Sequence, residues 1–125
     1  MLPPDIEIYL AGVEAAAVRD WLAERFPAAT LPWKPAGKRQ WRSEVSHDGQ
    51  RIPLLVIEEA CPGYTSLWFD SAHTPWPSDQ DCAREAFARF GVPVRATPGS
   101  WQEGDDPDLW WEITAAGEHE VHWPG

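Results

Sequence analysis

Residues 41 to 58 read Trp-Arg-Ser-Glu-Val-Ser-His-Asp-Gly-Gln-Arg-Ile-Pro-Leu-Leu-Val-Ile-Glu, and this segment gives the clearest indication of the fold. Two strand-like runs, 41–46 and 51–58, flank His47-Asp48-Gly49. A glycine that closes a three-residue loop is typical of a β-hairpin with a bulge. The second run is apolar on both faces, which predicts a central strand, although its Pro53 cannot donate to a sheet ladder.

One strand and one helix precede this hairpin. Residues 5–10, Asp-Ile-Glu-Ile-Tyr-Leu, alternate apolar and polar side chains, which predicts a half-buried strand. Across 13–26 apolar residues recur at helical spacing until Pro27 stops the run. A Pro-rich connection then leads to Trp41. The first half therefore has the order strand, helix, hairpin.

The second half repeats that order. Residues 64–70 are predicted to form a strand, and Ser78 followed by Asp81 resembles a capping box that begins a helix ending at Phe90. Gly91 then supplies a C-terminal stop. The remaining extended segments are 92–97, 109–114 and 119–123, and Ala115-Ala116-Gly117 joins the last two.

Two similar short segments, one in each half of the chain, also support an internal repeat. Glu44-Val45-Ser46-His47-Asp48-Gly49 matches Glu112-Ile113-Thr114-Ala115-Ala116-Gly117, in which an acid, a β-branched residue and a hydroxyl precede the loop. Units of about 1–60 and 61–125 are each too small to bury their own apolar face. We therefore predict one α+β domain over 1–125, a single antiparallel or mixed β-sheet with two helices on one face, built from two tandem strand-helix-hairpin (βαββ) units.

Charge disfavours several classes of partner. Ten basic and twenty acidic residues give a net charge of −10, which repels nucleic acid and anionic lipid. Residues 1–60 carry 7 basic and 9 acidic side chains, net −2, and 61–125 carry 3 and 11, net −8. The N-terminus lacks a secretory pattern and no apolar run is long enough to cross a membrane, so we expect a cytoplasmic protein without nucleic-acid or membrane partners.

The two cysteines predict no disulfide or zinc site, because Cys61 and Cys82 lack CxxC spacing. Cys82 stands in the first turn of the second predicted helix, where a helix N-terminus favours a thiolate. Asp79 and Asp81 oppose ionisation, and the alignment of the helices places Cys82 at the core-facing position of Val18. A buried structural thiol is the favoured interpretation, and an enzyme using Cys82 with His73 ranks third among the functions.

The C-terminal hairpin contains the side chains that are best suited to bind a ligand. With a three-residue loop, Glu112 lies opposite Glu120 and Trp110 opposite His122, so these four side chains share one face. Such a carboxylate pair beside an indole could receive an amine, a guanidinium or a divalent metal. The alternative is an ordinary solvated face. His119 and His122 are three apart on a strand, point to opposite faces and form no metal clamp.

Two oppositely charged loops occupy equivalent places in the two units. Lys34, Lys38, Arg39 and Arg42 interleave with Trp33 and Trp41, whereas Glu103, Asp105, Asp106 and Asp108 lie near Trp101. This polarity either guides contact with another copy or a complementary partner, or reflects two solvated loops of accidental composition.

Nine tryptophans in 125 residues is several times the usual frequency. Because exposed aromatic anchors typify protein interfaces, the leading hypothesis is a binding module, a regulator or inhibitor of another protein, anchored by Trp110, Trp101 and Trp76. The alternative is a domain that binds a small basic molecule or cation at Glu112, Glu120 and His122. We expect no cofactor, no resident metal, and a monomer or weak homodimer.

Overall fold

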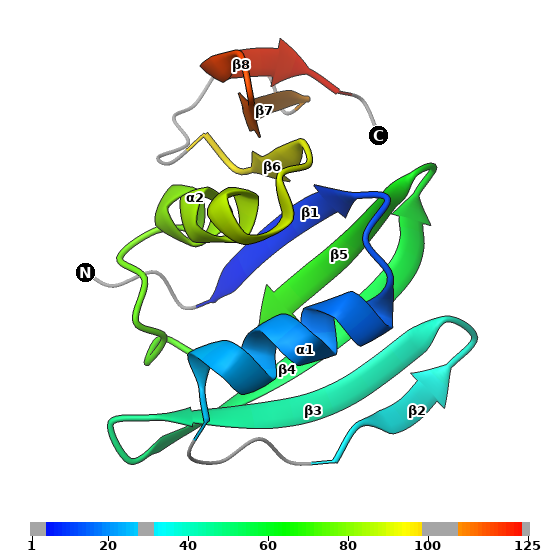
Figure 1. The fold of residues 1–125 in the computed structure, drawn as a ribbon, viewed down its shortest axis with the longest axis vertical. Coiled ribbons are helices and arrows are strands. Elements are labelled where there is room, and N and C mark those ends of the chain that lie inside the picture. Colours follow the sequence, from blue (N-terminus) through cyan, green and yellow to red (C-terminus); the bar gives the residue numbers. More distant parts are fainter. Residues whose placement is uncertain (1–4, 28–31, 99–107, 124–125) are drawn as a thin grey trace.

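The computed structural model describes residues 5–27, 32–98 and 108–123. Its strands are β1 (Ile6–Ala11), β2 (Lys34–Gly37), β3 (Gln40–His47), β4 (Gln50–Cys61), β5 (Tyr64–Phe69), β6 (Val94–Ala96), β7 (Leu109–Thr114) and β8 (Gly117–His122), and its helices are α1 (Ala15–Arg25) and α2 (Asp79–Phe90). Within these residues the strands form one antiparallel sheet in the order β2-β3-β4-β5-β1-β6-β7-β8. Both helices lie on one face of it (Figure 1). The predicted α+β class is confirmed, with strands predominating.

The two helices begin in different ways. Ser78 caps α2 locally, because its hydroxyl accepts from the Asp81 backbone N–H at 3.2 Å, and Gly91 ends the helix in the left-handed conformation at φ 68°. Glu14 precedes α1 without a side-chain cap. Glu58 of β4 replaces that cap, since its Oε2 accepts from the backbone N–H of Ala15 at 2.7 Å. The start of α1 is thus tied to the sheet.

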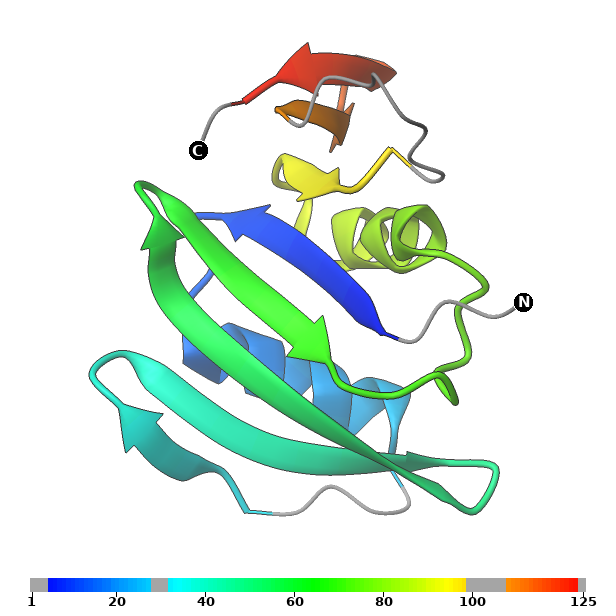
Figure 2. The ribbon, with the colours of Figure 1, turned by 180° about the vertical axis from the view of Figure 1, so that it is seen from behind.

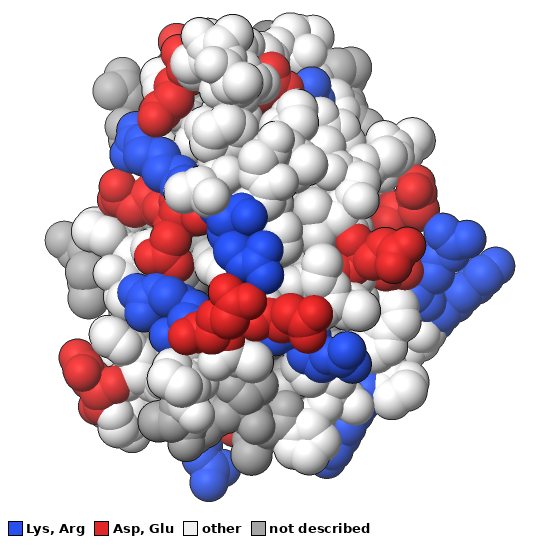
Figure 3. All heavy atoms as spheres, in the orientation of Figure 1, with Lys and Arg blue, Asp and Glu red and all other residues white. Residues whose placement is uncertain are grey.

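Ion pairs join the helices to each other. Arg25 Nε of α1 lies 2.9 Å from Glu85 Oε2 of α2, and Arg89 Nη2 of α2 lies 2.8 Å from Glu24 Oε2 of α1. Figure 3, which looks onto the helices, shows basic and acidic side chains side by side across this layer. The outer surface of the helix layer is therefore charged, while its inner surface packs on the sheet.

The tandem units are not confirmed, because strands from the two halves of the chain interleave. β1, from the first half, pairs with β5 on one side and β6 on the other. The last strand of the first half, β4, lies inside the sheet between β3 and β5, whereas the last strand of the second half, β8, forms an edge. The two halves share an order of elements but not an arrangement of strands.

The two hairpins predicted with three-residue loops, β3–β4 and β7–β8, turn with two residues instead. His47 pairs with Gln50 across Asp48 and Gly49, whose φ angles of 51° and 76° suit a tight hairpin turn. Thr114 likewise pairs with Gly117. His47 in the first hairpin and Gly117 in the second join the ladder, although each was predicted to lie in the loop. This one-residue difference changes which side chains share a face. β2 lies in the connection for which no strand was predicted.

Candidate functional site

One face of the sheet has no helix over it in the described ranges (Figure 2). Strand alternation divides the side chains: on β1, Ile6 and Ile8 are buried beneath the helices, while Glu7 and Tyr9 point to the opposite side and are half-buried. We call that opposite side the uncovered face. It draws side chains from strands far apart in sequence.

Four aromatic side chains gather on the uncovered face, and we call them the aromatic cluster: Tyr9, Tyr64, Trp110 and Trp123. Ring centroids lie 5.4 Å apart for Tyr9 and Trp110, 5.3 Å for Tyr9 and Trp123, and 4.9 Å for Tyr64 and Trp123. Trp110 and Trp123 pack edge to face at 5.3 Å. Such spacing lets each ring place an edge or face against its neighbours, which fixes the cluster's shape.

Arg95 of β6 lies at the centre of the aromatic cluster. Its guanidinium carbon is 4.9 Å from the Tyr64 ring centroid and 4.5 Å from that of Trp123. Its Nε donates to Glu112 Oε2 at 2.8 Å, and Glu112 Oε1 lies 3.2 Å from His119 Nε2. The Arg95 and Glu112 side chains are only 18% and 12% exposed. The rings thus cover an ion pair and leave mainly aromatic surface outward.

The phenol groups of the cluster stay neutral. Burial, followed by the charge of Glu7 and a hydrogen bond to it, raises the pKa of Tyr9 to about 12. The Tyr9 hydroxyl donates to Glu7 Oε1 at 3.2 Å. Burial also raises the pKa of Tyr64, although the charge of Arg95 opposes the rise. Both hydroxyls therefore remain protonated donors at neutral pH.

The predicted register of the C-terminal hairpin is wrong. Glu112 pairs with His119, Trp110 with Val121, Trp111 with Glu120 and Leu109 with His122. Because of the two-residue turn, Glu112 and Trp110 lie on the uncovered face, whereas Glu120 and His122 lie on the other. The proposed acidic pair does not exist, and Glu112 forms an ion pair with Arg95 instead. Val121, the partner of Trp110, lies on the uncovered face.

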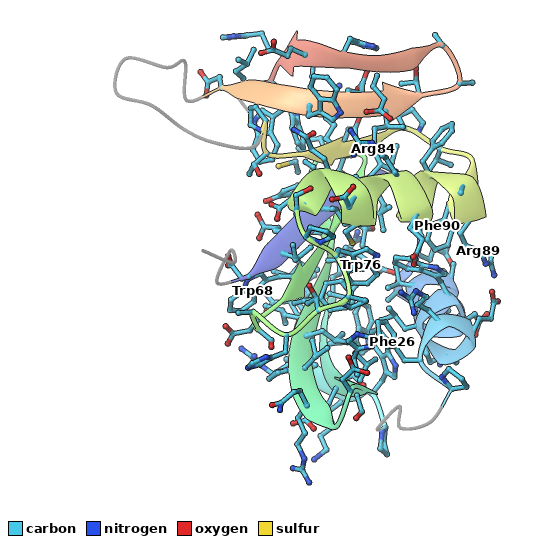
Figure 4. The ribbon with its side chains drawn as sticks, turned by 90° about the vertical axis from the view of Figure 1, so that its left-hand side faces the viewer. Phe26, Trp68, Trp76, Arg84, Arg89 and Phe90 are labelled. Carbon is cyan, nitrogen blue, oxygen red and sulfur yellow. The ribbon has the colours of Figure 1, made fainter. Side chains whose placement is uncertain are left out.

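The three tryptophans predicted as exposed anchors, Trp110, Trp76 and Trp101, have different outcomes in the structure. Trp110 is half-buried within the aromatic cluster. Trp76 is 6% exposed and belongs to the core, with ring centroids 5.1 Å from Phe69 and 5.9 Å from Phe26, so its assignment as an exposed anchor is wrong. Figure 4 shows Trp76 on the helix side of the sheet and Trp68 on the opposite side. Trp101 lies outside the described residues.

Sequence reasoning missed Tyr9, Tyr64, Arg95 and Trp123. The available signal was strand alternation, since Tyr9 and Tyr64 each stand one position out of phase with buried neighbours. That signal predicts an outward side chain, but not which strand lies beside it. β1 pairs with β6 only through the tertiary arrangement, so the cluster required the strand order.

Cys82 is fully buried, as predicted from its alignment with Val18. Burial raises the pKa of its thiol well above the ordinary value, and the charges of Glu85 and Asp79 act in the same direction. A neutral thiol enclosed by the core cannot act on a solvent-borne substrate without local opening.

A separate pocket of about 540 Å³ lies between the start of α1 and the β2–β3 hairpin. Trp33 and Trp41 form its aromatic wall, and Glu14, Arg19 and Glu58 bring charges of both signs. The Trp33 indole nitrogen is buried, and no described residue forms a hydrogen bond with it. The pocket combines aromatic surface with mixed charge, a suitable lining for a small polar molecule.

The sheet edges differ in charge. Lys34, Lys38, Arg39 and Arg42 lie on the β2–β3 hairpin at one edge, and Glu118 and Glu120 lie on β8 at the other. Of the predicted acidic loop, Asp108 alone is described; Glu103, Asp105 and Asp106 lie outside the described residues.

Searches among the described residues find no group of three or more His, Cys, Asp or Glu able to hold a metal ion. In the same part of the chain, neither helix is long and apolar enough to cross a membrane. Comparison of the chain with protein-family models, with curated proteins and with solved structures finds no match. The functional argument therefore depends on the geometry of the chain itself.

Proposed function

We propose that this protein is a protein-binding module that binds through the uncovered face of its sheet. The observation that carries the proposal is the aromatic cluster around the Arg95–Glu112 ion pair on a face with no described helix over it. Aromatic and arginine side chains are enriched in protein interfaces and dominate their binding energy. The proposed anchors are Trp110, Trp123 and Tyr64.

The structural role of the cluster's interior favours binding over catalysis. Arg95 and Glu112 neutralise each other, so the face offers rigid rings rather than a reactive charge. Rigid aromatic surface loses little conformational entropy when a partner covers it. A regulator or inhibitor that acts by occupying another protein's surface fits this arrangement.

Site-specific photocrosslinking in the producing cells tests the proposal. A photoreactive phenylalanine analogue replaces Leu55 or Val121, which are half-buried on the uncovered face. The matched control replaces Ala23, which is exposed on α1. We expect a crosslinked protein adduct from Leu55 and Val121 and none from Ala23. Absence of an adduct at both uncovered positions, or equal yield at Ala23, would contradict the proposal.

A second candidate function is binding of a small basic or zwitterionic molecule in the pocket beside α1. Its support is the wall of Trp33 and Trp41 beside Glu14 and Glu58. A thermal-shift screen with arginine, choline and betaine should raise the melting temperature of the native chain and of Trp110→Ala, but not of Trp33→Ala. An unchanged melting temperature with all three compounds removes this candidate.

A further inference from the structure

The two edges of the sheet differ in how easily a further strand can pair with them. β2 forms one edge, is four residues long, contains Pro35 and has a register shift between Pro35 and Gly37. Short length, proline and irregular pairing protect an edge from further pairing. β8 forms the other edge (Figure 1), is six residues long, contains no proline and pairs with β7 without a register shift. Of the two edges, β8 is therefore the one open to another strand.

The backbone of β8 has hydrogen-bonding groups that point out of the sheet. The Trp123 N–H donates to the Asp108 carbonyl at 2.7 Å, so these two residues form a hydrogen-bonded pair that continues the β7–β8 ladder. Because hydrogen-bonded and non-hydrogen-bonded pairs alternate in an antiparallel ladder, the N–H and C=O groups of Glu118 and Glu120 face away from β7. No described strand pairs with that side of β8. An extended segment can hydrogen-bond there, as in β-augmentation.

The side chains on the helix-covered side of β8 favour a basic segment. Arg84 of α2 already holds Glu118, since its Nη2 lies 2.9 Å from Glu118 Oε1. Glu120 is exposed, and no described residue forms a hydrogen bond or an ion pair with it. Directly paired residues of neighbouring strands place their side chains on the same face. A lysine or arginine opposite Glu120 would therefore supply the cation that this carboxylate lacks.

The opposite side of β8 favours apolar residues. His119 and Val121 lie on the uncovered face, where Val121 is half-buried and pairs with Trp110 of the aromatic cluster. The residues on either side of the basic residue of an added strand would lie beside His119 and Val121. Apolar side chains there would bury surface next to the aromatic cluster. The complementary segment thus alternates apolar and basic residues.

We propose that β8 binds an extended basic segment of another protein as an additional antiparallel strand, with lysine or arginine opposite Glu120. Antiparallel pairing with β8 of a second copy would instead bring two Glu120 carboxylates to the same side of the sheet, which like charge opposes. The inference goes beyond the proposed function, because it rests on backbone groups at an edge rather than on the aromatic cluster. Failure of either proposal leaves the other standing.

Fluorescence anisotropy with synthetic peptides tests backbone pairing. The probe is an end-capped peptide of about seven residues in which valine and lysine alternate. We expect it to bind the full chain, and N-methylation of its valine nitrogens to be tolerated, because these would face away from β8. N-methylation of its lysine nitrogens, or replacement of every lysine by glutamate, should weaken binding by at least about tenfold. Absence of binding, or equal binding of the peptide methylated at lysine, overturns the inference.

Variants of the chain locate the binding edge. Glu120→Lys should weaken peptide binding by at least about tenfold, whereas Asp20→Lys, the same charge change at an exposed position of α1, should alter it by less than about twofold. Glu120→Pro should weaken binding more than Glu120→Gln, because both remove the charge but only proline removes the outward N–H. Thermal melts verify that each variant folds. Equal effects of Glu120→Lys and Asp20→Lys, or of Glu120→Pro and Glu120→Gln, overturn the inference.

Discussion

The two faces of the sheet use tryptophan for different purposes. On the helix-covered face, Trp76 packs against Trp21, Phe26 and Phe69 and is 6% exposed. On the uncovered face, Trp123 packs against the other rings of the aromatic cluster and stays half-buried. The difference shows that the tryptophan excess divides into a core and a surface group, which residue counts alone do not separate.

The largest expected difference between the faces comes from removing an indole from each. Trp76→Ala should lower the free energy of unfolding by about 3–5 kcal/mol, because it leaves a cavity in the core. Trp110→Ala should cost only about 1–2 kcal/mol, because its ring is half-buried at the surface. Urea denaturation measures both values. A greater cost for Trp110→Ala would show that the aromatic cluster is part of the folding core.

The next prediction concerns the ion pair beneath the aromatic cluster. Glu112→Ala should destabilise the protein by about 2–3 kcal/mol, because Arg95 would keep its charge between two rings without a carboxylate partner. The double variant Arg95→Met with Glu112→Leu should recover most of the loss, since no buried charge then remains. Double-variant stability comparable to that of Glu112→Ala alone would instead assign the cost to lost packing.

Asp79, the first residue of α2, should make stability depend on pH. Burial raises its pKa from 3.8 to about 6, and the charges of Asp5 and Glu7 add to the rise, while hydrogen bonds from Thr97 and the Glu7 backbone oppose it. The folded state therefore binds this proton more tightly than the unfolded state. Its contribution to stability is complete below pH 3.8 and is lost as the pH rises through about 6.

Asp79→Asn should accordingly stabilise the protein at neutral pH and flatten the pH dependence of unfolding over that range. Asp81→Asn, in the same helix turn, is the control. Urea midpoints measured across the range check both variants. If Asp79→Asn keeps the slope of the native chain, another group is responsible for it.

The smallest effect is expected at the outer surface of the helix layer. Arg89→Ala removes an exposed pair with Glu24, which solvent screens. Arg25→Ala should shift the urea midpoint more, because the Arg25 guanidinium lies only 5.7 Å from the Trp76 ring centroid as well as beside Glu85. Equal shifts would mean that contact with the core aromatics adds nothing to the Arg25 pair.

Sequence patterns were most informative where interactions are local. Ser78 and Gly91 predicted both ends of α2, and alternation predicted β1, because caps and strand faces depend on neighbouring residues. The register of the β7–β8 hairpin was mispredicted by one residue, because a two-residue and a three-residue turn fit the same letters. That single residue placed Glu120 and His122 on the wrong face.

Local patterns in the chain were enough to predict the class of elements, their order, the buried position of Cys82 and the separation of charge along the chain. The position of β1 between β5 and β6, which brings Tyr9, Tyr64 and Arg95 together, follows from the strand order of the folded sheet. The burial of Trp76, which stands between two prolines, and the partial exposure of Trp110 also follow from that folded arrangement. These outcomes depend on pairing between distant strands, whose free energy comes from the completed sheet and its helices rather than from any local pattern.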